Sequence, residues 1–489
     1  MQTNFTTPDW VKNAVFYQIF PDRFAKSDRV TKPDNLEDWD SPPTVYGFKG
    51  GDLLGVVEHL DYLQDLGINA IYFNPIFQSA SNHRYHTHDY YRVDPILGGD
   101  QAFRTLLNEA HQRSIRIVLD GVFNHASRGF FQFNHIMENG TSSPYLDWFL
   151  VKNFPLNAYE GAPNYECWVD LPALPKFNTD NPKVRSFIFD VTRYWLDQGI
   201  DGWRLDVPYE IKDDAFWQEF RQLVKSINPD AYIVGEVAWE AQHWLQGDQF
   251  DAVMNYQFTQ ACLGFFAGER IDLKVEDGFM GLPPTRILGA PAFAHRAEEL
   301  LNLYPQQAVL VQLNLLSSHD MPRFISLAGG DQASQRLATL FQMTYPGAPC
   351  IYYGDEIGMQ GGASGYPEAS RHTFPWDETR WDQELRQYFK TCISLRHNHT
   401  ALRTGNFKTI YTEGQVYAYL RHSDEETLLV IVNNGTQSYP IDFAIDANMP
   451  ERSHWRYLLG EGDIRVSAGR LTGTPVAPRS GVVISYDPF

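Results

Sequence analysis

The sequence is poor in cysteine and in cationic side chains, and each shortage disfavours a class of protein. Only four cysteines occur among 489 residues, and none have the Cys-x-x-Cys spacing of a metal or redox motif. Lys and Arg number 40 against 60 Asp and Glu, and the net charge of −20 repels nucleic-acid phosphates. We therefore expect free thiols and no nucleic-acid partner.

The sequence also lacks an apolar run long enough to span a membrane, which takes about 18–20 residues. Its first residues, MQTNFTTPDW, lack the charged-then-apolar pattern of a signal peptide. Beyond the alternation described next, no internal repeat or low-complexity linker occurs. These absences predict a cytoplasmic protein with no membrane partner.

Short apolar runs alternate with longer segments of helical period through most of the chain, which is typical of βα units around a parallel sheet. Eight such runs predict strands: Val15–Phe20, Ala70–Phe73, Ile115–Val122, Gly202–Asp206, Tyr232–Glu236, Ala252–Asn255, Val311–Leu315 and Pro349–Tyr353. Helices are predicted at Leu53–Leu66, Gln101–Arg113, Pro182–Gln198 and Asp214–Ile227. The expected fold class is α/β, a (β/α)8 TIM barrel.

Two segments depart from this rhythm. Residues 123–178 are rich in Asn, Pro, Gly and aromatics, and predict an irregular excursion domain rather than another helix. After residue 396, short runs separated by turn signals predict an antiparallel C-terminal β-sandwich at 397–489. Its expected strands are Tyr411–Arg421, Thr427–Val432, Trp455–Leu459 and Val482–Tyr486. The barrel then takes residues 1–122 and 179–396.

Polar clusters fall at the carboxyl ends of four predicted strands, where a barrel gathers its catalytic side chains. They are Asp120–His125 (DGVFNH), Gly202–Asp206 (GWRLD), Gly235-Glu236 and Ser318–Asp320 (SHD). A retaining glycosidase needs two carboxyl groups about 5 Å apart, one as nucleophile and one as acid/base. Asp206 and Glu236 end neighbouring strands and so could meet at that range. A lone strand-end Asp is usually a cap or an ion-pair partner, so the prediction depends on all the clusters together.

Charge arrangement suggests how the two carboxyl groups differ. Arg204 lies two residues before Asp206 on the same strand face, and we expect its charge to keep Asp206 ionised. Nearby carboxylates should instead raise the pKa of Glu236, as an acid requires.

These clusters, together with Leu174–Asn178 (LPKFN), resemble the signature segments of the α-amylase family, glycoside hydrolase family 13, in their usual order. The resemblance covers essentially the whole chain. GWRLDVPYE, LPKFN and Ser81–Tyr85 (SNHRY) resemble the neopullulanase, cyclomaltodextrinase and maltogenic amylase group and related debranching enzymes. This resemblance implies a retaining hydrolase that cleaves α-1,4 links, α-1,6 links or both. Its implied substrates are maltooligosaccharides, pullulan, cyclodextrins or branched α-glucan.

The resemblance also assigns roles to individual residues. Asp206 matches the nucleophile, Glu236 the acid/base and Asp320 the carboxylate that stabilises the transition state. The residues that match substrate-binding positions or their helpers are His83, Tyr85, Asp120, His125, Arg204, Trp239, His319 and Arg371.

Some features depart from the family pattern. Relatives carry Asp-Pro-x-x-Arg after the eighth strand, whereas Tyr366–Arg371 (YPEASR) keeps the arginine and loses the aspartate. The tryptophan of the leaving-group side usually lies one position before Trp239. The N-terminal sandwich domain through which many relatives dimerise is not expected here, so an oligomer is possible but not implied.

No cofactor is expected, although calcium is possible. Many amylases bind calcium through the equivalent of Asn124 and an aspartate, and Lys176 stands at the aspartate position. The stretch Asp22–Asp34 lacks the ligand spacing of a calcium loop and is predicted to be a surface loop. His83, His86 and His88 likewise predict substrate contact or packing rather than a metal cluster.

Two other functions stay open. The same covalent intermediate can pass its sugar to another sugar, which would make the chain an α-glucan transglycosylase. A catalytically inactive sugar-binding protein could also use the fold, because a fold alone does not prove activity.

Overall fold

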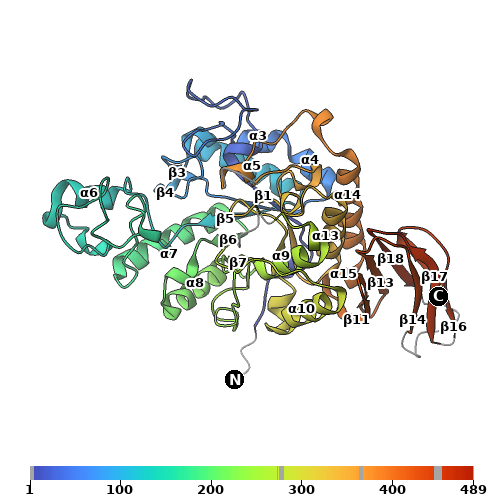
Figure 1. Cartoon of the computed structure of the whole chain (residues 1–489). Coiled ribbons are helices and arrows are strands. Elements are labelled where there is room, and N and C mark those ends of the chain that lie inside the picture. The colour runs from blue at the N-terminus through green and yellow to red at the C-terminus, as the bar shows by residue number, and fades with distance from the viewer. Residues whose placement is uncertain are drawn as a thin grey trace.

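The centre of the molecule is a closed parallel barrel. This computed structural model describes residues 5–272, 274, 280–362, 367–444, 454–467 and 469–487. Eight parallel strands pair in chain order, and a parallel bridge from Met254 to Leu313 joins the remaining edges. The strands are β1 (Phe16–Ile19), β2 (Ala70–Phe73), β5 (Arg116–Gly121), β6 (Gly202–Leu205), β7 (Tyr232–Gly235), β8 (Ala252–Val253), β9 (Leu313–Leu315) and β10 (Ala348–Tyr352). The predicted barrel is confirmed (Figure 1).

Helices surround the barrel and bury one face of each against it. In α8, an N-cap bond from Phe216 N to the Asp213 carboxylate starts the helix, and Phe216, Phe220 and Val224 are buried. The helices outside the inserted segment are α1 (Asp9–Lys12), α2 (Pro21–Phe24), α3 (Leu53–Glu58), α4 (Leu60–Leu66), α5 (Gly99–Gln112), α7 (Pro182–Gln198), α8 (Asp214–Ile227), α9 (Tyr256–Cys262), α10 (Ala290–Asn302), α11 (Gln306–Val309), α12 (Phe324–Leu327), α13 (Gln332–Thr344), α14 (Gln383–Asn398) and α15 (Thr400–Thr404).

The structure differs from the helical prediction at one helix, and it departs from the regular (β/α)8 pattern at one connection. The expected helix 53–66 is two helices that meet at His59, whose backbone leaves the helical region and whose ring stacks on Trp376. The connection from β7 to β8 contains turns and no helix, as its described residues 236–251 show. One barrel unit therefore lacks its covering helix.

The segment between β5 and α7 forms the excursion, which extends to the left of the barrel in Figure 1. Bridges between His125 and Lys176 and between Phe149 and Phe177 hold its two ends together. Aromatic side chains form its small core. The prediction of an irregular segment without a helix was wrong in one respect, because α6 (Phe131–Asn139) buries Phe133 against Phe149.

A hairpin that the sequence did not predict follows β2. Strands β3 (Phe77–Ser79) and β4 (Thr87–Val93) pair antiparallel, and the loop between them carries His83 and Tyr85. The hairpin therefore holds both ends of the segment that carries His83 and Tyr85.

The C-terminal part is a sandwich of two antiparallel sheets, as predicted. One sheet has the order β11-β12-β13-β18-β15 and the other β14-β17-β16. An apolar cluster between them includes Ile431 from the first sheet and Phe443 and Leu471 from the second. The strands are β11 (Asn406–Glu413), β12 (Val416–His422), β13 (Thr427–Asn433), β14 (Tyr439–Ala444), β15 (His454–Leu459), β16 (Ile464–Ser467), β17 (Arg470–Val476) and β18 (Ser480–Asp487). The expected strand 411–421 is in fact parts of two, which turn at Gly414.

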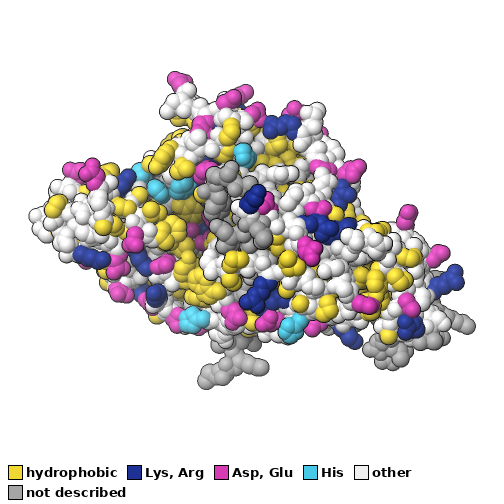
Figure 2. All heavy atoms as spheres, in the orientation of Figure 1, with side chains coloured by type: hydrophobic (Ala, Val, Ile, Leu, Met, Phe, Trp, Pro, Cys, Tyr) yellow, Lys and Arg dark blue, Asp and Glu magenta, His cyan; other side chains and the backbone are white. Residues whose placement is uncertain are grey.

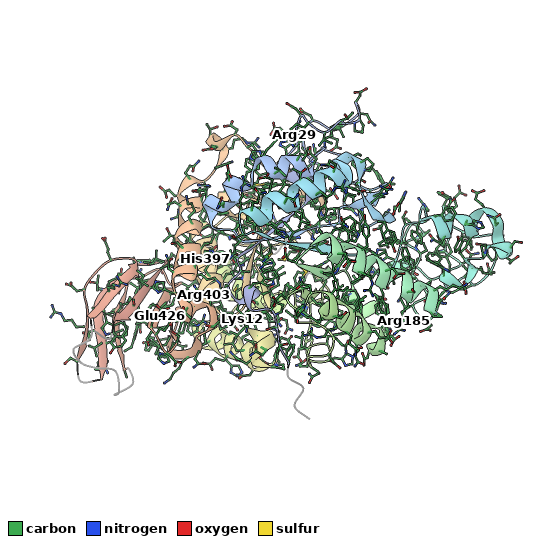
Figure 3. The ribbon with its side chains drawn as sticks, turned by 180° about the vertical axis from the view of Figure 1, so that it is seen from behind. Lys12, Arg29, Arg185, His397, Arg403 and Glu426 are labelled. Atoms are coloured by element: carbon green, nitrogen blue, oxygen red, sulfur yellow. The ribbon has the colours of Figure 1, made fainter. Side chains whose placement is uncertain are left out.

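Two buried arginines bond backbone carbonyl groups near the junction of the sandwich and the barrel, and Arg421 of the sandwich also donates to the carbonyl of Thr344 in α13. Arg396 of α14 donates to several backbone carbonyls, including that of Lys12, and Arg421 of β12 donates to the carbonyl of Leu402 at 2.9 Å. Figure 3 shows Lys12, His397, Arg403 and Glu426 on this side of the molecule, where Arg403 bonds to the carbonyl of His397. Carbonyl groups at the ends of helices thus accept hydrogen bonds from both arginines.

The prediction of a surface loop at residues 22–34 was wrong for its first residues. Asp22 is fully buried, accepts hydrogen bonds from the backbone N–H groups of Lys49 and Gly50, and pairs with Arg23 at 2.7 Å. These bonds provide hydrogen-bond partners for the buried carboxylate and hold the segment that follows β1 in place. Among the described residues, no helix combines the length and apolar character needed to cross a membrane.

Candidate active site

Strand register brings the two central carboxyl groups side by side. Leu205 of β6 is paired with Gly235 of β7, so the residues that follow, Asp206 and Glu236, lie level with each other. Gly202 permits this close pairing, because a Cβ there would lie 2.4 Å from the Tyr232 carbonyl oxygen. The convergence expected at the carboxyl ends of the strands is therefore present in the structure.

The guanidinium group of Arg204 contacts three acidic side chains of the site. Arg204 Nη1 lies 3.1 Å from Asp206 Oδ1 and 2.9 Å from Asp120 Oδ1. Its Nη2 lies 2.6 Å from Glu236 Oε1, although the angle is not that of a hydrogen bond. Because Asp206 and Glu236 both contact the guanidinium group of Arg204, their carboxyl groups lie close to each other. Oδ2 of Asp206 has no hydrogen-bond partner among the described residues and is left available for another group.

Arg204 was expected to keep Asp206 ionised, but other influences on the pKa of Asp206 are stronger. Burial, with the negative charge of Glu236, raises the pKa of Asp206 well above its ordinary value, and Arg204 opposes this rise. Burial also raises the pKa of Glu236 to about 7, against the effect of Arg204 and with that of Asp320. The expected rise for Glu236 is present, but its main cause is burial. Because the charge of Glu236 acts on Asp206, the two groups do not titrate independently.

Glu236 is held by the backbone that follows Asp206. The N–H of Val207 donates to Glu236 Oε2 at 3.0 Å. Val207 has φ 35° and ψ 50°, a left-handed conformation that a β-branched residue seldom adopts. Such strain typically costs about 1–3 kcal/mol and tends to occur at functional sites.

Asp320 has a different environment. His319 Nε2 lies 2.8 Å from Asp320 Oδ2, and Arg371 Nη2 lies 3.3 Å from Oδ1. The Gln18 amide nitrogen lies 2.9 Å from His319 Nδ1 and can only donate, so the ring proton is assigned to Nε2, facing Asp320. Against the effect of burial, His319 and then Arg371 lower the pKa of Asp320. Asp320 is therefore the group that stays ionised.

Asp120 is part of the support of the site rather than of its surface. Its carboxylate accepts from the hydroxyls of Tyr72 and Tyr85, each at 2.9 Å, and from Arg204. Only 2% of Asp120 is exposed. The Tyr85 hydroxyl also lies 2.7 Å from His319 Nε2, with the two rings nearly parallel. This network fixes the tyrosine ring at the floor of the site.

The carboxyl groups open into a cleft of about 650 Å³, which lies in the range of small-molecule sites. Eight of the predicted residues line it: His83, Tyr85, His125, Asp206, Glu236, Trp239, Asp320 and Arg371. Asp120, Arg204 and His319 do not, and lie behind its wall. Figure 2 shows hydrophobic and histidine side chains gathered around a hollow on this face, between the excursion and the barrel.

Trp239 and His125 are exposed to the cleft in different ways. Trp239 is 41% exposed and packs its ring against Tyr209 at 4.6 Å. His125 is almost fully buried, and burial lowers its pKa to about 3, so its ring is neutral. Its Nε2 has no hydrogen-bond partner among the described residues. A neutral ring nitrogen without a protein partner, on a residue that lines the cleft, can bond a hydroxyl group.

Comparison with known proteins identifies the family. Residues 18–425 match the family described as Alpha amylase, catalytic domain, and residues 407–484 match Neopullulanase-like, C-terminal domain. The chain belongs to the α-amylase family. It is an α-amylase-type glycosidase, and the predicted resemblance is confirmed.

Individual relatives of this α-amylase family member agree. It is 45% identical to a cyclomaltodextrinase of Bacillus sp over 434 residues, which are 88% of this chain and 74% of the relative. It is 39% identical to an intracellular maltogenic amylase of Bacillus subtilis (strain 168), over 88% of this chain and 70% of the relative. The crystal structure of the Nostoc punctiforme debranching enzyme in its native form has a TM-score of 0.89 and 49% identity, covering 99% of this chain and all of that one.

Several cleft residues of this family member were not predicted. Trp168 and Leu171 of the excursion line one wall, and Tyr209 and Val207 line the wall near Glu236. Tyr209 lies within the quoted GWRLDVPYE segment, so its position was a usable signal. Trp168 and Leu171 carried none, because the irregular backbone of the excursion decides which side chains face the cleft.

The site expected for calcium in relatives is occupied by a side chain of this family member. Lys176 Nζ donates to the backbone carbonyl of Glu210 at 2.8 Å and lies 3.1 Å from its carboxylate. Asn124 Oδ1 has no hydrogen-bond partner among the described residues, but the ammonium group is a poor neighbour for a divalent cation. Within those residues, no group of three or more His, Cys, Asp or Glu could hold a metal ion. At this position the Lys176 ammonium group therefore disfavours a divalent cation.

Proposed function

We propose that this enzyme hydrolyses α-glucosidic bonds of α-glucans with retention of configuration, through a covalent glycosyl intermediate. The observation that carries the proposal is the pair Asp206 and Glu236, level on neighbouring strands and touching one guanidinium at the floor of the cleft. Retaining glycosidases need two carboxyl groups so placed. The names of the relatives, cyclomaltodextrinase and maltogenic amylase among them, favour α-glucan as the substrate.

In the first step, Oδ2 of Asp206 attacks the anomeric carbon while Glu236 gives its proton to the leaving oxygen. The bond from the anomeric carbon to that oxygen breaks, and an ester to Asp206 forms. In the second step, Glu236 takes a proton from water, whose oxygen attacks the same carbon and releases Asp206. The raised pKa of Glu236 suits it to both transfers.

Asp320 acts by charge rather than by proton transfer. Since His319 and Arg371 keep it ionised, it can stabilise the positive charge that develops on the sugar ring. The Tyr85 ring, which lies parallel to the buried ring of His319 behind it, offers a flat floor for the sugar ring.

Transfer of the glycosyl group to a second sugar is the alternative that one observation favours. Trp239 and Tyr209 form an apolar pair beside Glu236, where an acceptor sugar could displace water. We further propose that the enzyme works in the cytoplasm, as the name of its Bacillus subtilis relative suggests for that protein.

Product analysis tests the function. We expect pullulan, maltoheptaose and β-cyclodextrin to be cleaved, and the anomeric proton signal of the first product to be that of the α-anomer. A β-anomer would overturn the retaining mechanism, and products longer than the substrate throughout the reaction would make transfer the main activity. The trisaccharide released from pullulan distinguishes α-1,4 from α-1,6 cleavage.

Azide tests the nucleophile. In an Asp206→Gly variant, azide should restore turnover and yield a β-glycosyl azide, because the small anion enters from the face vacated by the carboxylate. If the variant kept the turnover of the wild type and azide had no effect, Asp206 would not be the nucleophile.

A further inference from the structure

A pocket of about 310 Å³ lies between helices α9 and α10 and the segment 280–288. Figure 1 shows the two helices side by side. The residues that line the pocket are Gln257, Gln260, Ala261, Pro283, Pro284, Arg286, Leu288 and Arg296, and none of them lines the active-site cleft. The volume is at the lower end of the range of small-molecule sites, about 300–1,000 Å³. A small molecule is therefore the class of occupant that fits.

The lining of this α9–α10 pocket is cationic, although the chain as a whole is acidic. Two arginines line it, and no described Asp or Glu does. Arg286 is exposed and makes no ion pair with a described carboxylate. Arg296 pairs through Nη1 with Glu299 at 2.7 Å, which leaves the two guanidinium groups with one carboxylate between them. The charge balance of the pocket favours an anion.

The donors of the pocket come from three separate elements, which indicates the kind of anion. Arg286 belongs to the segment 280–288, Arg296 to α10 and Gln257 to α9. Since the side-chain oxygen of Gln257 accepts a hydrogen bond from Arg296, its amide nitrogen is the atom that can donate to a ligand. One guanidinium fork is enough for a planar carboxylate, whereas the tetrahedral oxygens of a phosphate accept from several directions.

The rest of the lining is apolar. Pro283, Pro284 and Leu288 offer carbon surface beside the arginines, and the pocket is larger than a free phosphate needs. This combination suits a phosphate ester, whose organic part covers the apolar wall while its phosphate bonds the arginines.

The same segment also borders the active-site cleft. Met280 and Gly281 line the cleft, whereas Pro283 lines the α9–α10 pocket and accepts a hydrogen bond of 2.6 Å from Gln260 of α9. Met280 has φ 52° and Gly281 has φ 75°. A non-glycine residue persists in this left-handed region only where its surroundings hold it. Contacts made in the pocket therefore act on a wall of the cleft.

We propose that the α9–α10 pocket is a regulatory site for a phosphorylated small molecule of the size of a hexose phosphate. The bound molecule holds the segment 280–288, and with it the cleft wall at Met280 and Gly281. A substrate then enters a cleft whose wall is already ordered, so it binds more tightly. The binding site itself does not depend on the proposed hydrolysis.

Calorimetric titration at constant ionic strength tests the ligand. Glucose 6-phosphate is the probe, inorganic phosphate tests a free anion, and glucuronate carries a carboxylate in place of the phosphate group. We expect glucose 6-phosphate to bind saturably at one site, and the other two to bind more weakly. Equal binding of inorganic phosphate would make the free anion the ligand and overturn the ester. Equal binding of glucuronate would overturn the choice of phosphate.

Two substitutions locate the site. Arg286→Gln and Arg296→Gln should each weaken the binding of glucose 6-phosphate by about tenfold, because each removes a charged hydrogen-bond donor. Arg193→Gln is the matched control, since Arg193 is exposed on α7 and does not line the pocket. An unchanged thermal midpoint shows that each variant is folded. Unchanged affinity in both pocket variants would place the ligand elsewhere and overturn the site.

Kinetics and a reciprocal titration test the link to the cleft. Glucose 6-phosphate should lower KM for maltoheptaose by about fivefold and change kcat less. Arg286→Gln should lose this response but keep the KM that the wild type has without the ligand. Linkage also requires that maltotriose, bound to the Glu236→Gln variant, tighten the binding of glucose 6-phosphate by the same factor as glucose 6-phosphate tightens that of maltotriose.

The outcomes separate this inference from the proposed function. No saturable binding of glucose 6-phosphate or phosphate would overturn the pocket as a site and leave hydrolysis untouched. Binding at the pocket with an unchanged KM and no reciprocal effect would overturn the regulatory role. A wild type that cleaves no α-glucan would overturn the proposed function, while the titrations would still decide whether the pocket binds a phosphate ester.

Discussion

The backbone N–H of Val207 donates a hydrogen bond of 3.0 Å to Oε2 of Glu236. Val207 directly follows Asp206, so a single left-handed residue links the positions of both central carboxyl groups. A mutation that moves one of them is therefore expected to move the other.

Replacing Glu236 by Gln should abolish most turnover of maltooligosaccharides while leaving their binding largely intact. The amide oxygen can still accept from Val207, but the group has no proton to transfer, and a general acid contributes about 10²–10⁴-fold. Steady-state kinetics measure the loss. The control is α-maltosyl fluoride, which needs no protonation and should lose far less. Unchanged turnover of maltooligosaccharides would refute the role of Glu236.

The pH dependence of kcat/KM should be bell-shaped, with its basic limb near pH 7. Burial raises the pKa of Glu236 to about 7, and the acid is active while protonated, so activity is lost as the pH rises through that value. The acidic limb reports ionisation of the coupled partner, Asp206. With α-maltosyl fluoride, the Glu236→Gln variant should lack the basic limb. Persistence of the limb in that variant would assign it to another group.

Replacing Asp120 by Asn should lower kcat by up to about 10²-fold and change KM less. Asp120 acts through Arg204 and Tyr85, and small displacements of reacting groups can have effects of that size. The matched control is Asp61→Asn, whose 84% exposed carboxylate pairs with Arg113 on the surface and should leave kcat unaltered. A change confined to KM would instead indicate direct substrate contact by Asp120.

Replacing Trp239 by Ala should lower kcat/KM on maltooligosaccharides by about tenfold, through loss of an exposed ring on the leaving-group side. The value for α-maltosyl fluoride should stay within about twofold, because that leaving group makes no sugar contact. Tyr46→Ala is the control, since Tyr46 is 91% exposed and does not line the cleft. Equal losses on both substrates would contradict a leaving-group role.

Removal of divalent cations should not change activity or the thermal midpoint. The Lys176 ammonium bonds to Glu210 in the region where relatives are expected to bind calcium. Thermal unfolding and turnover, each with and without excess EDTA, provide the measurement. A fall in the midpoint that calcium alone reverses would show that an ion binds here after all.

The sequence by itself determined the barrel, because each strand is a short apolar run of β-forming residues and each long helix has one apolar face. The helix over 182–198 was predicted to the residue, since Asn181 caps it and Gly199 ends it in a left-handed conformation. Asp206, Glu236 and Asp320 were recognisable because each directly follows a strand or lies just beyond its end.

Only the tertiary structure decided the environment of these groups. The pKa of Asp206 is raised although Arg204 lies beside it, because burial and the neighbouring carboxyl groups outweigh one cation. Such burial depends on segments far apart in the chain. The same holds for Trp168 and Leu171, which face the cleft through irregular backbone, and for the pocket between α9 and α10. Periodicity in sequence reports local structure, whereas depth, charge balance and cavities arise when distant segments pack together.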